Sequence, residues 1–259
     1  MVKEEIRRYA KTLGITEFGA AKTPDGKTVL VFLFPYFVGA REGNISLYAR
    51  SSDYHIIVKK YLLKIAEYIG GMDLSVYCDI NPLNERELAH KAGLGFYGKN
   101  NMLINPVYGS YFFIGCITAD NMDIPLDSPL DMTCSGCGRC IKSCPGGALS
   151  CEGFEISRCA SELSQKKGEL SPDEEAIILK SGLFWGCDKC QEVCPHNKNI
   201  PITPISEFKE NLIDYLPERD IISLSGRAFL KKYPDRAFTW RGKNVLLRNI
   251  NIYKNGKDI

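Results

Sequence analysis

The stretch CSGCGRCIKSCP, residues 134–145, decides how this chain is organised. Its cysteines follow the spacing C-x2-C-x2-C-x3-C-P, and a related run, CDKCQEVCP, occupies residues 187–195. In the first spacing, three close thiolates bind irons of one 4Fe–4S cluster, whereas the fourth Cys, just before Pro, binds a second cluster. The two runs therefore predict a pair of clusters and a protein that transfers electrons.

The second run lacks the first Cys of the complete pattern, and Cys159 can replace it from further up the chain. This gives eight ligands for two clusters, because each cluster needs four thiolates. We expect one cluster on Cys134, Cys137, Cys140 and Cys194, and the other on Cys144, Cys159, Cys187 and Cys190.

Structural zinc and disulfides are the alternatives for so many cysteines. Zinc sites use two separated C-x2-C pairs and gain nothing from a third close Cys or a trailing Pro. Disulfides are disfavoured because residues 1–5, MVKEE, do not have the form of a signal peptide, and reducing cytosol keeps thiols free. The spacing favours the two clusters, and we expect a cytoplasmic protein.

The composition is that of an ordinary globular protein. The chain has 259 residues, 44% hydrophobic and 25% charged, enough for one large or two modest domains. The longest apolar run, Val29–Val38, is about half the ~20 residues of a membrane span and is interrupted by Pro35, so it predicts a buried strand. Three cysteines remain outside the cluster set, and we expect buried thiols that pack as small hydrophobic side chains: Cys78, Cys116 and Cys151.

Positive charge is concentrated in the last part of the chain. Residues 227–259 contain nine Lys or Arg and two acids, a net charge of +7, so the rest of the chain carries −5 of the total of +2. With Trp240 and Tyr253 between the cations, this tail has the composition of a surface that contacts nucleic-acid phosphates. A solvated helix face has the same composition, and charge alone does not separate the two.

Helix-like and strand-like segments alternate in the first part of the chain. The pattern predicts helices over 4–13, 53–69 and 82–92, the last capped by Asn81, and strands over 28–34, 74–78, 101–105 and 110–118, with 106–109 as a turn. Helices are also expected over 224–233 and 243–253. The fold class is therefore α/β (α+β), with a sheet domain over 1–125, a ferredoxin-like two-cluster domain over 126–200 and a basic helical tail over 201–259.

Several blocks of sequence together resemble the epoxyqueuosine reductase family. They are YARSSDYH at 48–55, DINPLNER at 79–86, AGLGFYGKN at 92–100 and GSYFFIG at 109–115, then CASEL at 159–163 and GCDKCQEVCP at 186–195. The resemblance extends from about Leu13 to about Tyr253. Few other families join such blocks to a two-cluster module, so the combination is specific.

The resemblance implies a cobalamin-dependent oxidoreductase that converts epoxyqueuosine to queuosine at the wobble position of tRNA. Two electrons would pass through the clusters to cobalamin in the sheet domain, and an aspartate that corresponds to Asp79 would give the proton. Lys99 could face a corrin amide or phosphate, and it is equally compatible with a surface lysine. The family's cobalamin contacts correspond to four other positions: Leu103, Ile114, Ser161 and Asp188.

Two short motifs match or nearly match the sequence of a known cofactor signature, but the secondary structure expected around them does not fit that signature. GLGFYG at 93–98 fits the dinucleotide fingerprint G-x-G-x-x-G, but it follows a predicted helix and precedes a predicted strand. DYHIIV at 53–58 nearly matches the cobalamin signature D-x-H-x-x-G, but it lacks the Gly and lies in a predicted helix. We therefore do not expect His55 to bind cobalt, and His90 and His196 do not form a metal site with it.

Epoxide chemistry gives Asp79 a physical reason for its implied role. Opening the ring generates an alkoxide, and a carboxylic acid that transfers a proton to it typically accelerates such a step ~10²–10⁴-fold. The acid must be protonated near neutral pH, which requires an apolar, desolvated setting that the flanking Cys78 and Ile80 and a large corrin face could supply. The alternative is that Asp79 caps the following helix, a position for which Asn81 is better placed.

Two features distinguish this chain from full-length family members. Those members usually carry more helical sequence before the first strand and helical repeats at the C-terminus that help to hold tRNA, so the resemblance implies a short form. His196 also stands where many relatives have Trp. We expect tRNA as a partner through phosphate contacts of the basic tail, an electron donor such as ferredoxin or flavodoxin, and no membrane.

Two other functions remain open. A related cobalamin and iron–sulfur reductase would act on a small-molecule epoxide or an organohalide, as reductive dehalogenases do. A non-catalytic electron-transfer or cobalamin-binding protein would keep the cysteines but would not need the motif around Asp79. The resemblance favours the tRNA-modifying enzyme.

Overall fold

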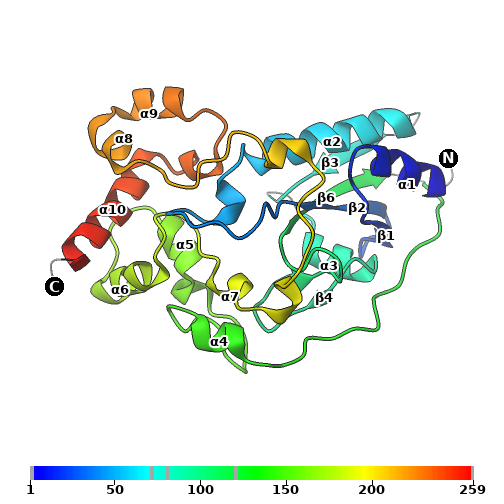
Figure 1. Ribbon diagram of the computed structural model, residues 1–259. Helices are drawn as coiled ribbons and strands as arrows, with labels where there is room; N and C mark the ends of the chain where they lie inside the picture. Colours follow the sequence, from blue (N-terminus) through cyan, green and yellow to red (C-terminus); the bar gives the residue numbers. More distant parts are fainter. Residues whose placement is uncertain (1–2, 71–72, 80–81, 120–121, 258–259) are drawn as a thin grey trace.

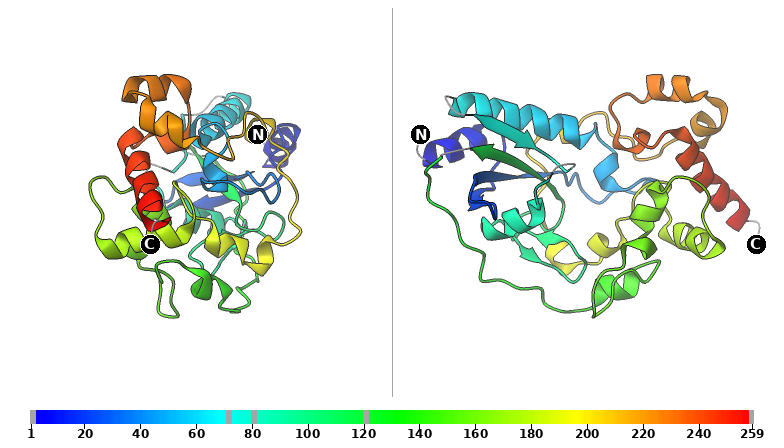
Figure 2. Two further views of the ribbon diagram at one scale, coloured as in Figure 1. Left: turned by 60° about the vertical axis from the view of Figure 1, so that its left-hand side comes forward. Right: turned by 180° about the vertical axis from the view of Figure 1, so that it is seen from behind.

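The computed structural model describes residues 3–70, 73–79, 82–119 and 122–257. A small sheet with its helices forms one end of the molecule, and the last helices of the chain form the other end (Figures 1 and 2). The cysteine-rich segment connects the two ends along one side (Figure 1). No helix within the described ranges is long and apolar enough to cross a membrane.

The sheet is antiparallel throughout and has the strand order β1-β2-β6-β3. Every residue of β2 is buried, as its unbroken apolar run predicted. A separate two-stranded hairpin pairs β4 with β5. The strands are β1 (Phe18–Lys22), β2 (Thr28–Pro35), β3 (Leu74–Tyr77), β4 (Phe96–Tyr97), β5 (Leu103–Ile104) and β6 (Phe112–Ala119).

Helices occupy the segments between the strands and most of the chain beyond β6. The α-helices in the described ranges are α1 (Lys3–Thr12), α2 (Tyr54–Ile69), α3 (Glu85–Lys91), α4 (Arg139–Ser143), α5 (Ala160–Gln165), α6 (Pro172–Ser181), α7 (Lys189–Glu192), α8 (Glu218–Ser223), α9 (Gly226–Lys232) and α10 (Lys243–Lys257). Short 3-10 helices are η1 (Leu47–Ala49), η2 (Ile156–Arg158), η3 (Pro195–Asn197), η4 (Ser206–Phe208) and η5 (Ala237–Thr239).

Helices cover both faces of the sheet because alternate residues of β2 point to opposite sides. Leu30 and Phe32 pack with α1 and α2 on one face. Val31 and Leu33 pack with α3 on the other face. Burial of apolar surface on two sides, favourable by about 25 cal/mol per Å², fixes β2 and its neighbour β6 as the rigid support of the cavity described below.

The C-terminal helices share a core with earlier parts of the chain. Ile45 and Trp185 pack with Leu246 and Ile250 of α10. This core includes residues on both sides of position 200, where the sequence predicted a domain boundary. Helix α10 also lies against α5 and α6 of the cysteine-rich segment. The last helices are therefore packed on the rest of the protein, while the exact domain limits stay a prediction.

Five cations of the basic tail make contacts within the protein. Arg236, Lys243 and Arg248 donate hydrogen bonds to backbone carbonyl oxygens. Lys232 and Lys254 pair with acidic side chains. These contacts give part of the tail's positive charge a structural role, which weakens its interpretation as an open phosphate-binding surface.

Three local predictions are wrong. Strand β1 was missed because its sequence, FGAAK, is rich in small residues and poor in strand formers. The strands expected over 101–105 and 110–118 do not form one hairpin, since β5 pairs with β4 and β6 pairs with β2 and β3. The helix expected from Pro82 begins at Glu85, with Asn84 as its N-cap, and Asn81 lies outside the described residues.

Candidate active site and cluster ligands

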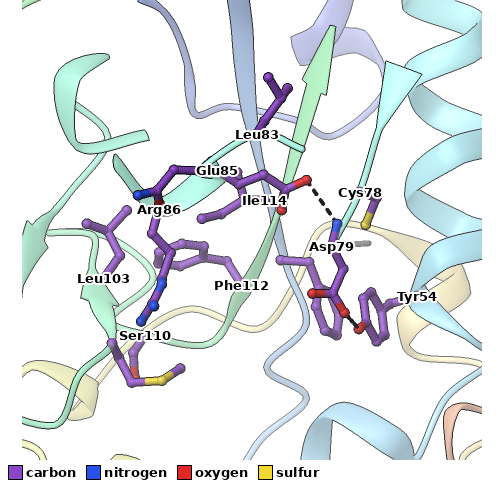
Figure 3. Close-up of a pocket in the computed structure, with 13 residues that line it drawn as sticks. Tyr54, Cys78, Asp79, Leu83, Glu85, Arg86, Leu103, Ser110, Phe112 and Ile114 are labelled. Atoms are coloured by element: carbon purple, nitrogen blue, oxygen red, sulfur yellow. Dashed lines mark hydrogen bonds between the residues drawn. The ribbon is translucent and has the colours of Figure 1, made fainter. Parts of the chain in front are cut away.

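A cavity of about 330 Å³ lies at the edge of the sheet, where β3 ends and α3 begins. Figure 3 shows Tyr54 and Asp79 on one side of it, Arg86 and Leu103 on the other, and Phe112 between them. The antiparallel pairing of β3 with β6 brings these segments together, because it sets Tyr77 at the end of β3 beside Cys116 in the middle of β6, so the chain after β3 runs toward the start of β6. The sheet thus positions a carboxylate opposite a guanidinium across an apolar floor.

Asp79 sits on a turn directly after β3. Its φ of +62° is in the left-handed region, which Asp adopts more readily than most residues. The backbone N–H of Asp79 donates to Glu85 Oε1 at 2.9 Å, and the hydroxyl of Tyr54 donates to Asp79 Oδ2 (Figure 3). The carboxylate lines the cavity with 58% of the side chain exposed, and it does not cap α3, whose N-cap is Asn84.

His55, in the first turn of α2, stands between two carboxylates. Its Nδ1 lies 2.8 Å from Asp53 Oδ1, and its Nε2 lies 3.4 Å from Asp79 Oδ2. The second contact is an ion pair without hydrogen-bond alignment, since Nε2 has no hydrogen-bond partner. The hydrogen bond to Asp53, and then the interaction with Asp79, raise the pKa of His55 to about 9. The imidazole is therefore protonated at neutral pH.

The described residues around Asp79 do not by themselves give it an apolar setting, and Ile80 lies outside the described residues. Interaction with His55 lowers the pKa of Asp79 despite partial burial, and the Tyr54 hydroxyl lowers it further. The proton that the site holds at neutral pH therefore resides on His55. The sequence did not reveal this arrangement, because it depends on the packing of α2 against β3.

A second cavity, of about 350 Å³, adjoins the first on the side of the cysteine-rich segment. The two cavities share side chains as walls: Arg86, Met102, Phe112 and Phe113. Four thiols line the second cavity: Cys144, Cys159, Cys187 and Cys190. These two adjoining cavities, which we together call the hollow, thus have Asp79 in one part and these four cysteines in the other.

These four thiols also form an electrostatic group. Burial raises the pKa of Cys190, and the negative charges of Cys187, Cys159 and Cys144 raise this pKa further. Deprotonating the group without a cation is unfavourable, and a positively charged metal centre relieves that repulsion. The donor set therefore fits a metal cluster.

The other four cysteines of the two runs form a second group. Burial raises the pKa of Cys194, and the charges of Cys134, Cys140 and Cys137 raise it as well. The two groups are those expected from the spacing, and their role as ligands stays a prediction. In the described part of the chain, no three His, Cys, Asp or Glu side chains converge on one metal ion. A 4Fe–4S cluster does not require that, because each thiolate binds a different iron.

The expected cobalamin contacts are dispersed around the hollow. Leu103 and Ile114 line the first cavity, and Ser161 lines the second. Asp188 lines neither cavity, because it is buried and accepts hydrogen bonds from the Ser46 hydroxyl and the Leu47 N–H. Lys99 is exposed and also lines neither, so the structure favours a surface role for it.

Sequence reasoning missed other residues that face the hollow. Arg86 lines both cavities and donates to the Asn101 carbonyl at 2.7 Å. Asn100 is only 5% exposed, lines the second cavity and has no partner for its Nδ2. A buried amide without a partner is rare, and this one offers a hydrogen bond to a ligand. Both residues, like Tyr54, lie in the blocks that carry the resemblance, which was the only signal for them.

The three cysteines outside the two groups differ from one another. Cys116 is buried as expected, and Cys78 is half-buried against the core under α2. Cys151 is exposed, so the expectation of a buried thiol is wrong there. Its position in the loop between α4 and η2 leaves it on the surface beside the cluster segment.

Two family models match this chain. Residues 133–197 match a 4Fe–4S double cluster binding domain, which confirms the prediction of a two-cluster segment. Residues 20–80 match the model described as epoxyqueuosine reductase QueG.

Curated epoxyqueuosine reductases are similar over most of this chain. One from Lactococcus garvieae is 36% identical over 219 residues, which are 81% of this chain and 61% of the relative. One from Francisella cf. novicida is 38% identical over 221 residues, which are 81% of this chain and 60% of that relative. The chain thus spans about 60% of the length of the curated relatives it matches.

Solved structures show the same fold. An epoxyqueuosine reductase in complex with an epoxyqueuosine-modified tRNA-Tyr stem loop is 25% identical, with a TM-score of 0.86 over 97% of this chain and 80% of that one. An epoxyqueuosine reductase from Streptococcus thermophilus is 25% identical, with a TM-score of 0.82 and the same coverage. The reductive dehalogenase NpRdhA, 17% identical over 95% of this chain and 38% of that one, shares the fold at a TM-score of 0.53. In its sequence, its two-cluster segment and its fold, the chain is thus similar to epoxyqueuosine reductases.

Proposed function

We propose that this protein is a cobalamin- and iron–sulfur-dependent reductase that converts epoxyqueuosine to queuosine in tRNA. The observation that carries the proposal is that the cavity lined by Asp79 adjoins the cavity lined by the four thiols and shares side chains with it as walls. A redox centre at one end and a proton source at the other are what an epoxide needs for reductive removal of its oxygen. The family relationship supplies the substrate class.

The two groups of thiols would each hold one 4Fe–4S cluster. Cys137 is exposed, which brings the first group to the surface. The second group lines the hollow, so its cluster would lie nearest the reaction. Electrons from a donor protein would then enter at the first cluster and leave from the second. The ligand sets are Cys134, Cys137, Cys140 and Cys194 for the first, and Cys144, Cys159, Cys187 and Cys190 for the second.

The residues that line the two cavities suit cobalamin by their chemistry. Leu103 and Ile114 offer apolar contacts to a corrin ring, while the unpaired Asn100 amide and Ser161 offer polar ones. When bound there, cobalamin would supply a strongly reducing metal centre. No described His lines the first cavity, and His55 beside it is held between Asp53 and Asp79.

Asp79 and His55 together would supply protons to the reaction. Removal of the epoxide oxygen as water consumes two electrons and two protons. A pair of groups that can hold protons therefore fits the stoichiometry better than a single carboxylic acid. His55 Nε2 holds a proton 3.4 Å from Asp79 Oδ2, and Asp79 faces the cavity. Asp79 would receive that proton and pass it to the oxygen of the opened ring. The Tyr54 hydroxyl would keep the carboxylate oriented.

The partners follow from this role. tRNA would be the substrate, and a low-potential carrier such as ferredoxin or flavodoxin would donate electrons. A tRNA-modifying enzyme of this kind would work in the cytoplasm.

The decisive experiment is anaerobic conversion of epoxyqueuosine to queuosine in tRNA by the reconstituted protein, with the free nucleoside as a parallel substrate. We expect product from tRNA. No product from either substrate would contradict the proposal, and product from the nucleoside alone would favour a small-molecule reductase.

Asp79→Asn tests the proposed acid in the same assay. We expect it to bind iron and cobalamin normally, as read from their absorbance, and to lose at least about 100-fold in turnover. Asp73→Asn, an exposed carboxylate beyond the other end of β3, is the matched control and should keep full turnover. Normal turnover in Asp79→Asn would remove this residue from the mechanism.

A further inference from the structure

One of the two tryptophans of the chain is exposed in an unusual way. Trp240 follows η5 and has 53% of its surface open, whereas Trp185 is fully buried. The guanidinium carbon of Arg241 lies 3.6 Å from the centre of the Trp240 ring. This is the stacked geometry in which a cation and an indole attract each other. Arg241 thus holds the ring while much of it stays open to solvent.

Hydrogen bonds connect this ring to the wall of the second cavity. Trp240 Nε1 donates to Gln165 Oε1 at 3.2 Å. The same amide group donates through Nε2 to the Tyr48 hydroxyl at 3.4 Å and to the Ser161 carbonyl at 3.1 Å. Tyr48 and Ser161 both line the second cavity. Trp240 therefore stands one side chain away from the cavity, with its orientation fixed.

We propose that Trp240, backed by Arg241, is a stacking platform for an unpaired base of the RNA substrate. The proposal rests on the proposed function, since an RNA whose modified nucleotide enters the hollow must place neighbouring nucleotides close to its rim. Proteins hold unstacked bases on aromatic rings and on guanidinium planes, because every base offers a π face. Trp240 and Arg241 present both groups as one unit.

The surroundings favour this role over a purely structural one. A ring that served only the core would be buried, as Trp185 is. The side-chain amide of Gln165 is engaged at both ends, so it holds the indole in one orientation. Other cations of this segment, such as Arg236 and Arg248, donate to backbone carbonyls, whereas Arg241 stacks on the ring and its Nε has no hydrogen-bond partner.

Binding of a fluorescently labelled tRNA anticodon stem loop to the reconstituted protein tests the proposal without turnover. We expect Trp240→Ala to raise the Kd by about 5- to 150-fold, the contribution of one stacked base. Trp240→Phe, which keeps a stacking ring, should stay within about fivefold of wild type. Tyr215→Ala removes an aromatic side chain that is 59% exposed elsewhere, and it should leave the Kd unchanged.

If Trp240→Ala binds the stem loop with the same Kd as the wild type, Trp240 is not a stacking platform, and the proposed function is unaffected. Absence of RNA binding by the wild type would overturn both. If Trp240→Ala fails to fold, quenching of the tryptophan fluorescence of the wild-type protein by acrylamide tests the platform instead. Acrylamide reaches Trp240, which is exposed, and not Trp185, which is buried. We expect the stem loop to protect the fluorescence from quenching, and unchanged quenching with RNA bound would overturn the platform.

Discussion

His55 and Asp79 form an ion pair at the edge of the first cavity, with Nε2 of the imidazole 3.4 Å from Oδ2 of the carboxylate. The two groups have opposite pKa shifts, since the pKa of His55 is raised to about 9 and the pKa of Asp79 is lowered. The hydrogen bond to Asp53 contributes most to the raised pKa of His55 and Asp79 adds to it, whereas the interaction with His55 contributes most to the lowered pKa of Asp79. The site is thus a charged pair in which the histidine carries the proton, and this sets the pH behaviour of the protein.

His55→Gln tests that arrangement through the pH dependence of kcat/KM. In the wild type, the stored proton is present below the raised pKa of His55 and is lost as the pH rises through about 9. Without the imidazole, the site no longer holds this proton above neutral pH. We therefore expect the alkaline limb of the profile to move to lower pH, with turnover at pH 8 reduced about 10- to 100-fold. Retention of the wild-type alkaline limb would show that His55 does not supply the proton.

His90→Gln is the matched control for that substitution. The ring of His90 lies 2.9 Å from the Gly95 carbonyl and lines neither cavity. Its removal should leave the pH profile unchanged.

Substitution of one cysteine from each group should remove one cluster at a time. Cys137→Ala takes a ligand from the first group and Cys159→Ala takes one from the second, so each should lower iron from about eight to about four per chain. Cys151→Ala changes an exposed thiol of the same segment that belongs to neither group, and it should keep all the iron. Iron analysis with electron paramagnetic resonance distinguishes the two remaining clusters. Loss of iron in Cys151→Ala, or full iron in Cys137→Ala, would refute the ligand sets.

The two-cluster segment could be derived from the sequence because the ligand spacing is local and its chemistry is strict, while the ligand set of each cluster stays a prediction. Strand β2 and helix α2 could be predicted for a similar reason. The continuous apolar residues of β2 indicate a strand buried on both faces, and the periodic ones of α2 indicate a helix buried on one face. The antiparallel order of the sheet could not be predicted, because pairing between β2 and β6 joins segments far apart in the chain.

The chemistry around Asp79 was predicted only in part. The resemblance pointed to Asp79, whose role stays a prediction, but the ionisation of Asp79 depends on His55, which reaches it from another element across a tertiary contact. The same limit applies to Trp240, whose orientation depends on Gln165. Sequence patterns report neighbours along one helix or strand, whereas pKa values and ring orientations follow from the contacts between elements.

Electron delivery should depend on positive charge beside the exposed Cys137. Arg139 and Lys142 of α4 are exposed close to this thiol in sequence, and acidic carriers are attracted by such charge. We expect the double variant Arg139→Glu, Lys142→Glu to slow association with an acidic ferredoxin or flavodoxin about tenfold at low salt, with a smaller difference at high salt. Stopped-flow mixing measures this rate. Lys180→Glu, an exposed cation at the end of α6, is the control, and an equal effect there would argue against a specific docking face.

Asn249 should be among the most sensitive positions for stability outside the cavity. Its side chain is fully buried in α10 and donates to the carbonyls of Ser164 at 2.8 Å and Phe184 at 2.7 Å. Asn249→Ala leaves two buried acceptors unpaired, so we expect it to lower the free energy of unfolding by about 2–4 kcal/mol. Asn244→Ala, an exposed position on the same helix, should stay within about 0.5 kcal/mol of wild type. Anaerobic urea unfolding of the cluster-loaded protein measures both, and equal midpoints for the two variants would show that these hydrogen bonds do not attach α10 to the cluster segment.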